Sequence, residues 1–266
     1  MLTISLQPAP INDLFNSLGY ELTLDILFLA SITLLTSAFA AIMGQGGGIM
    51  LIAVLAGAVP SASLIAVHGV IQACSNGSRA FLAKKEIDWP IILPVTLGIL
   101  LGAALISPII PLLNWQWMQG FIALYILWLT WGHLLPTPKI QLMNIKSRHP
   151  YLKLGLLQGS FGMALGATGP LGNALLLKKG LSKDSIIANN ALIMFISHVA
   201  KILFFSLLGV QLLNHLELLI CLSLAAIAGS YLGNHFRKSL PEHLFFPLFK
   251  LLLTLLALRM LILAVD

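Results

Sequence analysis

Long apolar runs, separated by glycine, proline and basic residues, make up most of the chain. They cover residues 22–43, 48–59, 61–83, 90–110 and 115–135 in the first half, and 151–168, 170–178, 184–210, 214–234 and 243–264 in the second. A helix needs roughly 20 apolar residues to cross the hydrocarbon of a bilayer, so the runs at 48–59 and 170–178 are short. The pattern predicts an all-α polytopic membrane protein with about ten helical segments.

The stretch between the two halves, residues 136–150, carries prolines and basic residues and indicates a linker. We expect one integral membrane transporter domain over residues 1–266, with a first repeat at 22–135, a cytoplasmic linker at 136–150 and a second repeat at 151–264. Five segments per repeat is an odd number. The two repeats would therefore have opposite orientations in the membrane, as in secondary transporters with inverted repeats.

Basic residues indicate which side faces the cytoplasm. If both short runs count as crossings, the basic groups around Lys84, Lys179 and Arg237 fall on the same side as the linker. If the short runs dip in and return, these groups are split between the two sides, against the positive-inside rule. We therefore expect ten segments, with both chain termini outside.

Two glycine-rich breaks interrupt the apolar sequence at matching positions. The first is GQGGG at residues 44–48 and the second is GATGP at residues 166–170. Gly44 precedes Arg79 by 35 residues, and Gly166 precedes Lys201 by the same number. A helix broken inside lipid leaves backbone groups without partners, so it persists only where protein or a wet cavity surrounds it. The matched breaks therefore predict a binding site between the repeats.

A polar stripe follows each break on one face of a predicted helix. Its members are His68, Gln72, Ser75, Asn76 and Arg79 in the first half, and Asn190, Met194, Ser197, His198 and Lys201 at the corresponding positions of the second. Polar residues are costly against lipid, so both stripes should face the interior of the bundle. Arg79 lies close to Lys84 and has the alternative of reaching the headgroups, whereas Lys201 is followed by a long apolar run.

The overall composition narrows the function. The chain has 58% hydrophobic and 9% charged residues, whereas about 25% of the residues in a soluble globular protein are charged. The composition therefore excludes a soluble globular protein, and the apolar runs leave no room for a soluble catalytic domain. The net charge of +6 sits mostly in the connections, which indicates lipid headgroups rather than nucleic acid as a partner. Cys74 and Cys221 are the only cysteines, and both lie in apolar runs, so we expect no metal site. We also expect no other cofactor and no enzyme activity.

Positive potential at the breaks indicates an anion site. Helices that begin at the breaks present unpaired N–H groups and the positive end of their dipole, and no carboxylate lies deep in an apolar run. The alternative is that these glycines only permit close packing, which is what we expect for the G-x-x-x-G pairs Gly98/Gly102 and Gly229/Gly233. The predicted substrate-binding residues are Gly46, Gly47, Gly48, Ser75, Asn76, Arg79, Gly169, Asn190, Ser197 and Lys201.

Two histidines, His68 and His198, are the remaining groups in the stripes that titrate near neutral pH. They are candidates for proton coupling, and protons are then a second partner. The alternative is that each is a hydrogen-bonded packing residue.

The chain resembles a known family in several of these features. It is similar to the TauE/SafE sulfite exporter (TSUP) permeases in the GQGGG motif, in Pro60 at the end of the short run, in the KEIDW connection at 85–89 and in a degenerate second copy of the motif. The resemblance covers essentially the whole chain. It implies a multi-pass transporter of the bacterial cytoplasmic (inner) membrane for sulfite, sulfonates or related anions. The chain departs from the family pattern at Ile49–Ala53, which lacks a proline, at the thinned second cluster and at Asn189–Asn190.

We therefore expect a permease that moves a small anion, such as sulfite or an organosulfonate, by alternating access. One alternative is a passive anion channel. Another is an intramembrane hydrolase with Ser160 as nucleophile and His198 as base, which would leave the duplicated break unexplained. The sequence leaves open the exact substrate, the direction of transport, the coupling ion, the oligomeric state and whether the short runs cross the membrane fully.

Overall fold

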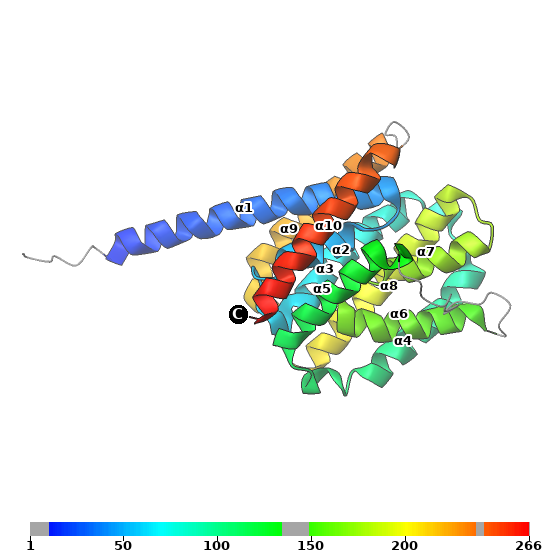
Figure 1. Cartoon of the computed structure of the whole chain (residues 1–266), viewed down its shortest axis with the longest axis horizontal. Helices are drawn as coiled ribbons and strands as arrows, with labels where there is room; N and C mark the ends of the chain where they lie inside the picture. The colour runs from blue at the N-terminus through cyan, green and yellow to red at the C-terminus, as the bar shows by residue number, and fades with distance from the viewer. Residues whose placement is uncertain (1–10, 135–148, 238–241, 266) are drawn as a thin grey trace, which may run out of the picture.

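The computed structural model describes residues 11–134, 149–237 and 242–265, and these segments form ten α-helices joined by short turns (Figure 1). The helices are α1 Ile11–Met43, α2 Gly47–Leu55, α3 Ser61–Leu82, α4 Trp89–Ile106, α5 Trp115–Trp131, α6 Pro150–Leu165, α7 Gly169–Lys178, α8 Lys183–Leu207, α9 Leu216–Phe236 and α10 Glu242–Val265. The predicted all-α architecture with two short helices is confirmed. Most of the expected linker, 136–150, lies outside the described residues.

Helix ends differ from the expected ones where backbone chemistry intervenes. The second helix ends at Leu55 rather than near residue 59, because Gly57 has a φ of 87°, a left-handed conformation that stops a helix. The eighth ends at Leu207, two residues before Gly209 with a φ of 89°. The fourth ends at Ile106, because Pro108 follows and cannot continue the hydrogen-bond ladder.

In the described part of the chain, four helical stretches are long and apolar enough to cross a membrane. They are Asp25–Met43, Trp89–Ile106, Lys183–Leu207 and Leu212–Phe236. The stretch Trp117–Trp131 is also apolar but shorter. By contrast, α2 and α7 have 9 and 10 residues. At about 1.5 Å per residue each is about 15 Å long, half of the hydrocarbon thickness.

Basic connections meet at one end of the molecule, which we call the basic end. Lys179 after α7 forms an ion pair of 2.7 Å with Asp88 before α4, and Arg237 after α9 forms one of 2.8 Å with Asp184 at the start of α8. The side chain of Asn189 also accepts a hydrogen bond from the backbone N–H of Asp88. These contacts place three connections on the same side. The first described part of α1 and the last part of α10 lie toward the other end (Figure 1).

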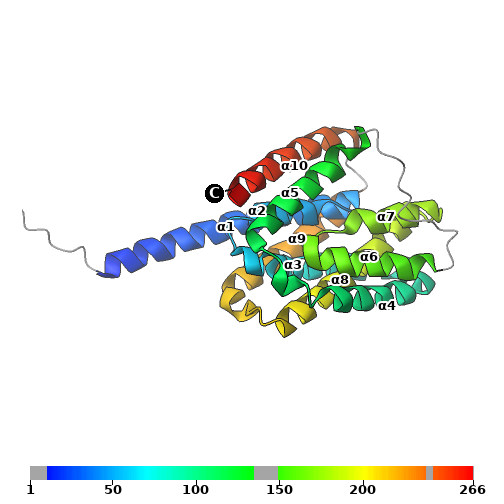
Figure 2. The same cartoon turned by 60° about the horizontal axis from the view of Figure 1, so that its bottom comes forward.

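Small residues hold two pairs of parallel helices in close contact. A Cβ at Gly98 or Gly102 of α4 would stand 2.3 Å from a backbone oxygen of α6, and one at Gly229 or Gly233 of α9 would stand within 2.2 Å of a backbone oxygen of α1. Figure 2 shows α6 running beside α4. Both G-x-x-x-G pairs are therefore packing motifs, as expected, and each joins a helix of one half to a helix of the other.

Helices at corresponding positions of the two halves also pack on each other. Residues 69 and 77 of α3 face residues near 198 and 195 of α8, so these two helices are antiparallel. In the same way Gly120 of α5 faces Ala264, and Trp131 donates a hydrogen bond of 2.8 Å to Thr254 of α10. If each helix is replaced by its counterpart in the other half, the contact between α1 and α9 becomes that between α6 and α4. In the same way, the contact between α3 and α9 becomes that between α8 and α4. This arrangement is compatible with an in-plane two-fold axis.

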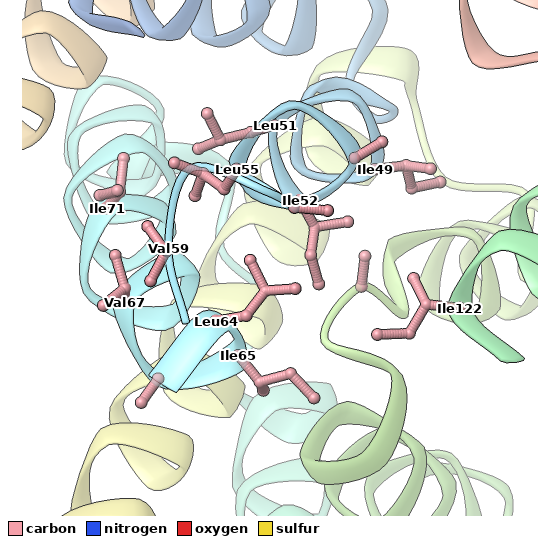
Figure 3. Packing of buried hydrophobic residues seen from close by; sticks show 14 of the residues in the cluster. Ile49, Leu51, Ile52, Leu55, Val59, Leu64, Ile65, Val67, Ile71 and Ile122 are labelled. Carbon is pink, nitrogen blue, oxygen red and sulfur yellow. The ribbon is translucent and has the colours of Figure 1, made fainter. Parts of the chain in front are cut away.

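Two apolar clusters fill the bundle. The larger lies between α2, α3 and α5 away from the basic end, where Ile52 and Leu64 point into a shared interior that Ile122 also enters (Figure 3). The smaller joins α4, α6, α7 and α8 around Ile99 and Ile193.

Candidate functional site

Each glycine-rich break is the tip of a helical hairpin. The chain runs along α1 toward the basic end, turns at residues 44–46 and returns along α2, whereas α6 runs away from the basic end, turns at 166–168 and returns along α7. Gly44, Gly46 and Gly166 have φ values of 78°, 96° and 81°. This left-handed region strains residues with a Cβ, which explains why glycine marks both turns.

Gly47 has a different role, since it lets α2 approach α1. A Cβ at Gly47 would stand 2.1 Å from the carbonyl oxygen of Thr36 and 2.7 Å from the Cβ of Ala40. At Gly169, the first residue of α7, the nearest atoms to an added Cβ lie 3.9 and 4.0 Å away. At its first residue, α2 is therefore packed more tightly than α7.

A single cavity brings both breaks and both polar stripes together. Within it, about 30 Å³ is open to the centre of a water molecule, against the roughly 10–15 Å³ that one water needs. Its lining includes the predicted residues Gly46, Gly47, Gly48, His68, Asn76, Arg79, Gly169, Asn190 and His198. Gln45, Gln72 and Met194 also line it, whereas Ser75, Ser197 and Lys201 do not. None of the described lining residues is acidic.

Arg79 is buried and holds the end of the helix before the first break. Its Nη1 donates a hydrogen bond of 2.9 Å to the carbonyl oxygen of Ala40, in the last turn of α1, and its Nη2 donates to Oδ1 of Asn76. The first contact places positive charge at the negative end of the α1 dipole. Nε of Arg79 has no partner among the described residues, so one N–H of the guanidinium is available at the cavity.

Asn76 and Gln72 form a polar ladder that ends at the cavity. Nδ2 of Asn76 donates to the backbone oxygen and to Oε1 of Gln72, at 2.8 and 3.1 Å. This leaves Nε2 of Gln72 buried and without a partner in the described structure. Oδ1 of Asn190 and Nδ1 of His68 are also unpartnered. Since a buried polar group without a partner is costly, these three side chains and Nε of Arg79 indicate a site that takes a polar guest.

Lys201 lies behind the cavity and belongs to the second break. Its ammonium group donates to the carbonyl oxygen of Gly166, the residue that follows α6, and contacts Nδ1 of His198 at 3.0 Å. The rings of His198 and His68 lie 5.6 Å apart at 76°. Nε2 of His68 donates to the carbonyl oxygen of Gly48 at 2.9 Å. Side chains of α3 and α8 therefore connect the two breaks.

The two helix N-termini differ in what they offer. No side chain caps α2, which begins after Gly46, so the N–H groups of its first turn are available at the break. Thr168 precedes α7 and makes no capping hydrogen bond, and Pro170 in its first turn has no N–H. The first break therefore offers more N–H groups than the second.

The remaining predicted residues face other helices. The hydroxyl of Ser75 lies 3.1 Å from that of Ser230 on α9, and Oγ of Ser197 lies beside Gly162 of α6. The hydroxyl of Ser160 donates to the carbonyl oxygen of Gly102 on α4, at 3.2 Å. His198 contacts Lys201 instead of Ser160, so the geometry lends no support to a Ser160–His198 hydrolase.

Three amide side chains join the site without having been predicted. Gln72 was part of the polar stripe, which was a usable signal. Gln45, inside the first break, accepts a hydrogen bond of 2.8 Å from Asn173 of α7, which joins the two hairpins. Nothing in the sequence pairs these two residues, which are 128 positions apart. In the described part of the chain no group of three or more His, Cys, Asp or Glu could hold a metal ion.

A family model described as sulfite exporter TauE/SafE matches residues 29–260. This covers all ten helices at least in part, including both breaks and both polar stripes. No curated protein and no solved structure matches the chain.

Proposed function

The chain belongs to the TauE/SafE sulfite exporter family, and on that premise we propose that it is a secondary carrier of a small oxyanion, either sulfite or an organosulfonate. Family membership implies a membrane transporter of sulfite or related anions. We place it in a bacterial cytoplasmic membrane with the basic end in the cytoplasm, in accordance with the positive-inside rule.

The observation that carries the proposal is the charge balance of the site. Among the described residues, Arg79 and Lys201 are the buried charged side chains, and no Asp or Glu is buried. An anion about 4 Å from a unit positive charge gains about 4 kcal/mol at an effective dielectric constant of 20, and about half of that at 8 Å. Because Arg79 lines the cavity and Lys201 stands behind it, Arg79 supplies the larger share of the attraction.

Donors at the cavity suit an oxyanion in particular. The first turn of α2, Nε of Arg79 and Nε2 of Gln72 provide N–H groups from three directions. Together they would replace part of the water shell of an oxyanion. His68 and Asn190 provide acceptors, which suit water or a protonated oxygen of the guest.

The two hairpins support alternating access by inverted repeats. Their tips point in opposite directions along the bundle and meet at the same cavity. The first tip lies nearer the basic end, since Gly44 packs against Ile187 close to the start of α8. Rocking one repeat against the other would expose the cavity to each side in turn.

Topology is tested by cysteine labelling. Single cysteines at Glu86 and Leu213 should react with an impermeant reagent from opposite sides of the membrane. Labelling of both from the same side would refute the inverted arrangement.

Transport is tested with purified protein in liposomes. Labelled sulfite should enter with saturable kinetics and exchange against internal sulfite, with sulfate, thiosulfate and sulfonates as competitors. Arg79→Met should weaken binding roughly a thousandfold and Lys201→Met roughly thirtyfold, from the energies above. Lys153→Met, at an exposed position of α6, is the matched control and should transport normally. Unsaturated conductance without exchange would instead favour a channel.

A further inference from the structure

Matching positions of the two halves carry different cations, and the difference has chemical consequences. Arg79 and Lys201 occur 35 residues after the first glycine of each break, and both are buried. A guanidinium keeps its proton in proteins, whereas a lysine ammonium group can release one when it is buried. One half of the site therefore has a fixed charge and the other has a charge that can be discharged.

An acceptor for the lysine proton is already in contact. Nδ1 of His198 lies 3.0 Å from the ammonium nitrogen. In this contact the ammonium N–H donates to a bare ring nitrogen, so His198 is neutral with its hydrogen on Nε2. The proton needs only to cross one hydrogen bond.

His68 offers a second acceptor beside the same break. Its Nε2 donates to the carbonyl oxygen of Gly48, so in the neutral ring Nδ1 is bare. Nδ1 has no partner among the described residues and lies 3.8 Å from where a Cβ of Gly166 would stand. The carbonyl oxygen of Gly166 is the other partner of Lys201. Two imidazoles, one on each polar stripe, thus flank the lysine.

We propose that Lys201 carries the coupling proton, so that each anion moves together with one proton, and that His198 exchanges this proton with the lysine. The proposal rests on the proposed anion transport. With the anion bound, its charge offsets those of Arg79 and Lys201. When the anion leaves, two buried cations remain without a buried carboxylate in the described structure, which is costly.

The carrier lowers this cost by discharging Lys201. The N–H bond at Nζ breaks as an N–H bond forms at Nδ1 of His198, and Nε2–H of the resulting imidazolium passes its proton to water on the side to which the anion was released. The unloaded carrier then returns with a neutral amine and neutral imidazoles. Arg79 keeps its charge throughout and retains its bond to Ala40.

The groups that face the Lys201–His198 pair are few. From α3 they are His68 and Arg79. On the described parts of α6 the titratable side chains, Tyr151 and Lys153, lie in the first turn at the basic end, and α4 has none. Lys179 follows α7 and forms an ion pair with Asp88 at that same end.

The decisive variant is Lys201→Arg, which keeps the charge and removes the exchangeable proton. Wild type and variant are reconstituted in liposomes at zero membrane potential, with sulfite as the probe and an internal pH dye. A gradient of one pH unit, alkaline inside, should make the wild type accumulate sulfite about tenfold if one proton is coupled to each anion. The dye should report acidification that depends on the protein, after subtraction of sulfur dioxide leakage in protein-free liposomes.

Lys201→Arg should still exchange internal for external sulfite but lose the accumulation and the acidification. His198→Gln gives a second test that does not depend on how arginine fits, because the amide oxygen can accept from Lys201 but cannot carry a proton. It should exchange sulfite and accumulate it slowly. His235→Gln, at an exposed position of α9, is the matched control and should behave as the wild type.

The outcomes separate the two proposals. Wild-type protein that exchanges sulfite without moving protons, or a Lys201→Arg variant that still accumulates it, would overturn proton coupling and leave anion transport intact. Wild-type protein without any sulfite exchange would overturn the proposed function itself.

Discussion

Replacing Gly47 by alanine adds one methyl group where α2 passes closest to α1. The added Cβ would stand 2.1 Å from the carbonyl oxygen of Thr36 and 2.7 Å from the Cβ of Ala40. Both obstacles belong to α1, and one is backbone, so no side-chain rotation relieves the contact. The first turn of α2 must move away from α1 by roughly 1 Å to restore ordinary contact distances.

Two measurable effects follow from that displacement. Overpacking of this kind costs about 1–3 kcal/mol of stability. The second effect is on binding, because the N–H groups of the first turn shift relative to Arg79 and Gln72. A misplacement of about 1 Å between converging groups can cost on the order of a hundredfold in rate. We expect a lower unfolding temperature in detergent and a large loss of sulfite exchange in liposomes.

Gly169→Ala is the control for this experiment. It changes the equivalent helix start, where the nearest atom to the new Cβ is the sulfur of Met194 at 3.9 Å. The variant should keep the stability of the wild type. The reasoning fails if Gly47→Ala is as stable as the wild type and transports normally, or if Gly169→Ala lowers the unfolding temperature equally.

Further variants test the packing, the basic end and the alternative chemistry. Gly98→Ala puts a Cβ 2.3 Å from the backbone oxygen of Leu152 and should cost about 1–3 kcal/mol in thermal unfolding, whereas Gly120→Ala, with 3.5 Å of clearance, should be tolerated. Asp88→Asn breaks a partly exposed ion pair and should cost less than about 1 kcal/mol; a loss of several kcal/mol would show that the pair does more than join two connections. The hydrogen bond to Asp88 raises the pKa of Lys179. The small stabilisation that protonated Lys179 contributes through this pair is therefore present at neutral pH, and it is lost only as the pH rises through that raised pKa. Ser160→Ala removes a hydroxyl that donates to Gly102 and should leave sulfite exchange unchanged, whereas abolished function would revive the hydrolase hypothesis.

Local chemistry explains why the helices and breaks were predictable. Gly44, Gly46 and Gly166 adopt left-handed conformations that few other residues tolerate, so the glycine pattern marked both turns. The apolar runs located most helices to within a few residues. The first helix is an exception, because it begins at Ile11 rather than at residue 22, and Gly57 and Pro108 each end a helix early. These features depend on residues that are adjacent in sequence.

The contacts that individual residues of the polar stripe make were less predictable. The third helix packs between α8 and α9 as well as beside α2, and a stripe on one face is wide enough to reach more than one neighbour. Ser75 consequently meets Ser230, while Asn76, the next residue, lines the cavity. Lys201 uses its long side chain to reach the end of α6 instead of the cavity. Helical periodicity indicates the direction in which a side chain points, but not which neighbouring helix or cavity lies there.

Contacts between the halves were outside what the sequence could indicate. The hydrogen bond from Asn173 to Gln45 depends on how two hairpins meet, and the two residues have no common motif. The short cavity-lining segment at Gly169–Pro170 matched the first break in position but not in donors, because proline lacks an N–H.

The close pairing of α1 with α9 and of α4 with α6 also bears on how the molecule could have arisen and how it assembles. In each pair one partner comes from each half, and the contact is backbone against glycine. A single half would leave its glycine-lined groove uncovered, so a half-length chain would need a second copy to cover it. During synthesis, α1 has to wait in the bilayer until α9 emerges before its most extensive contact can form.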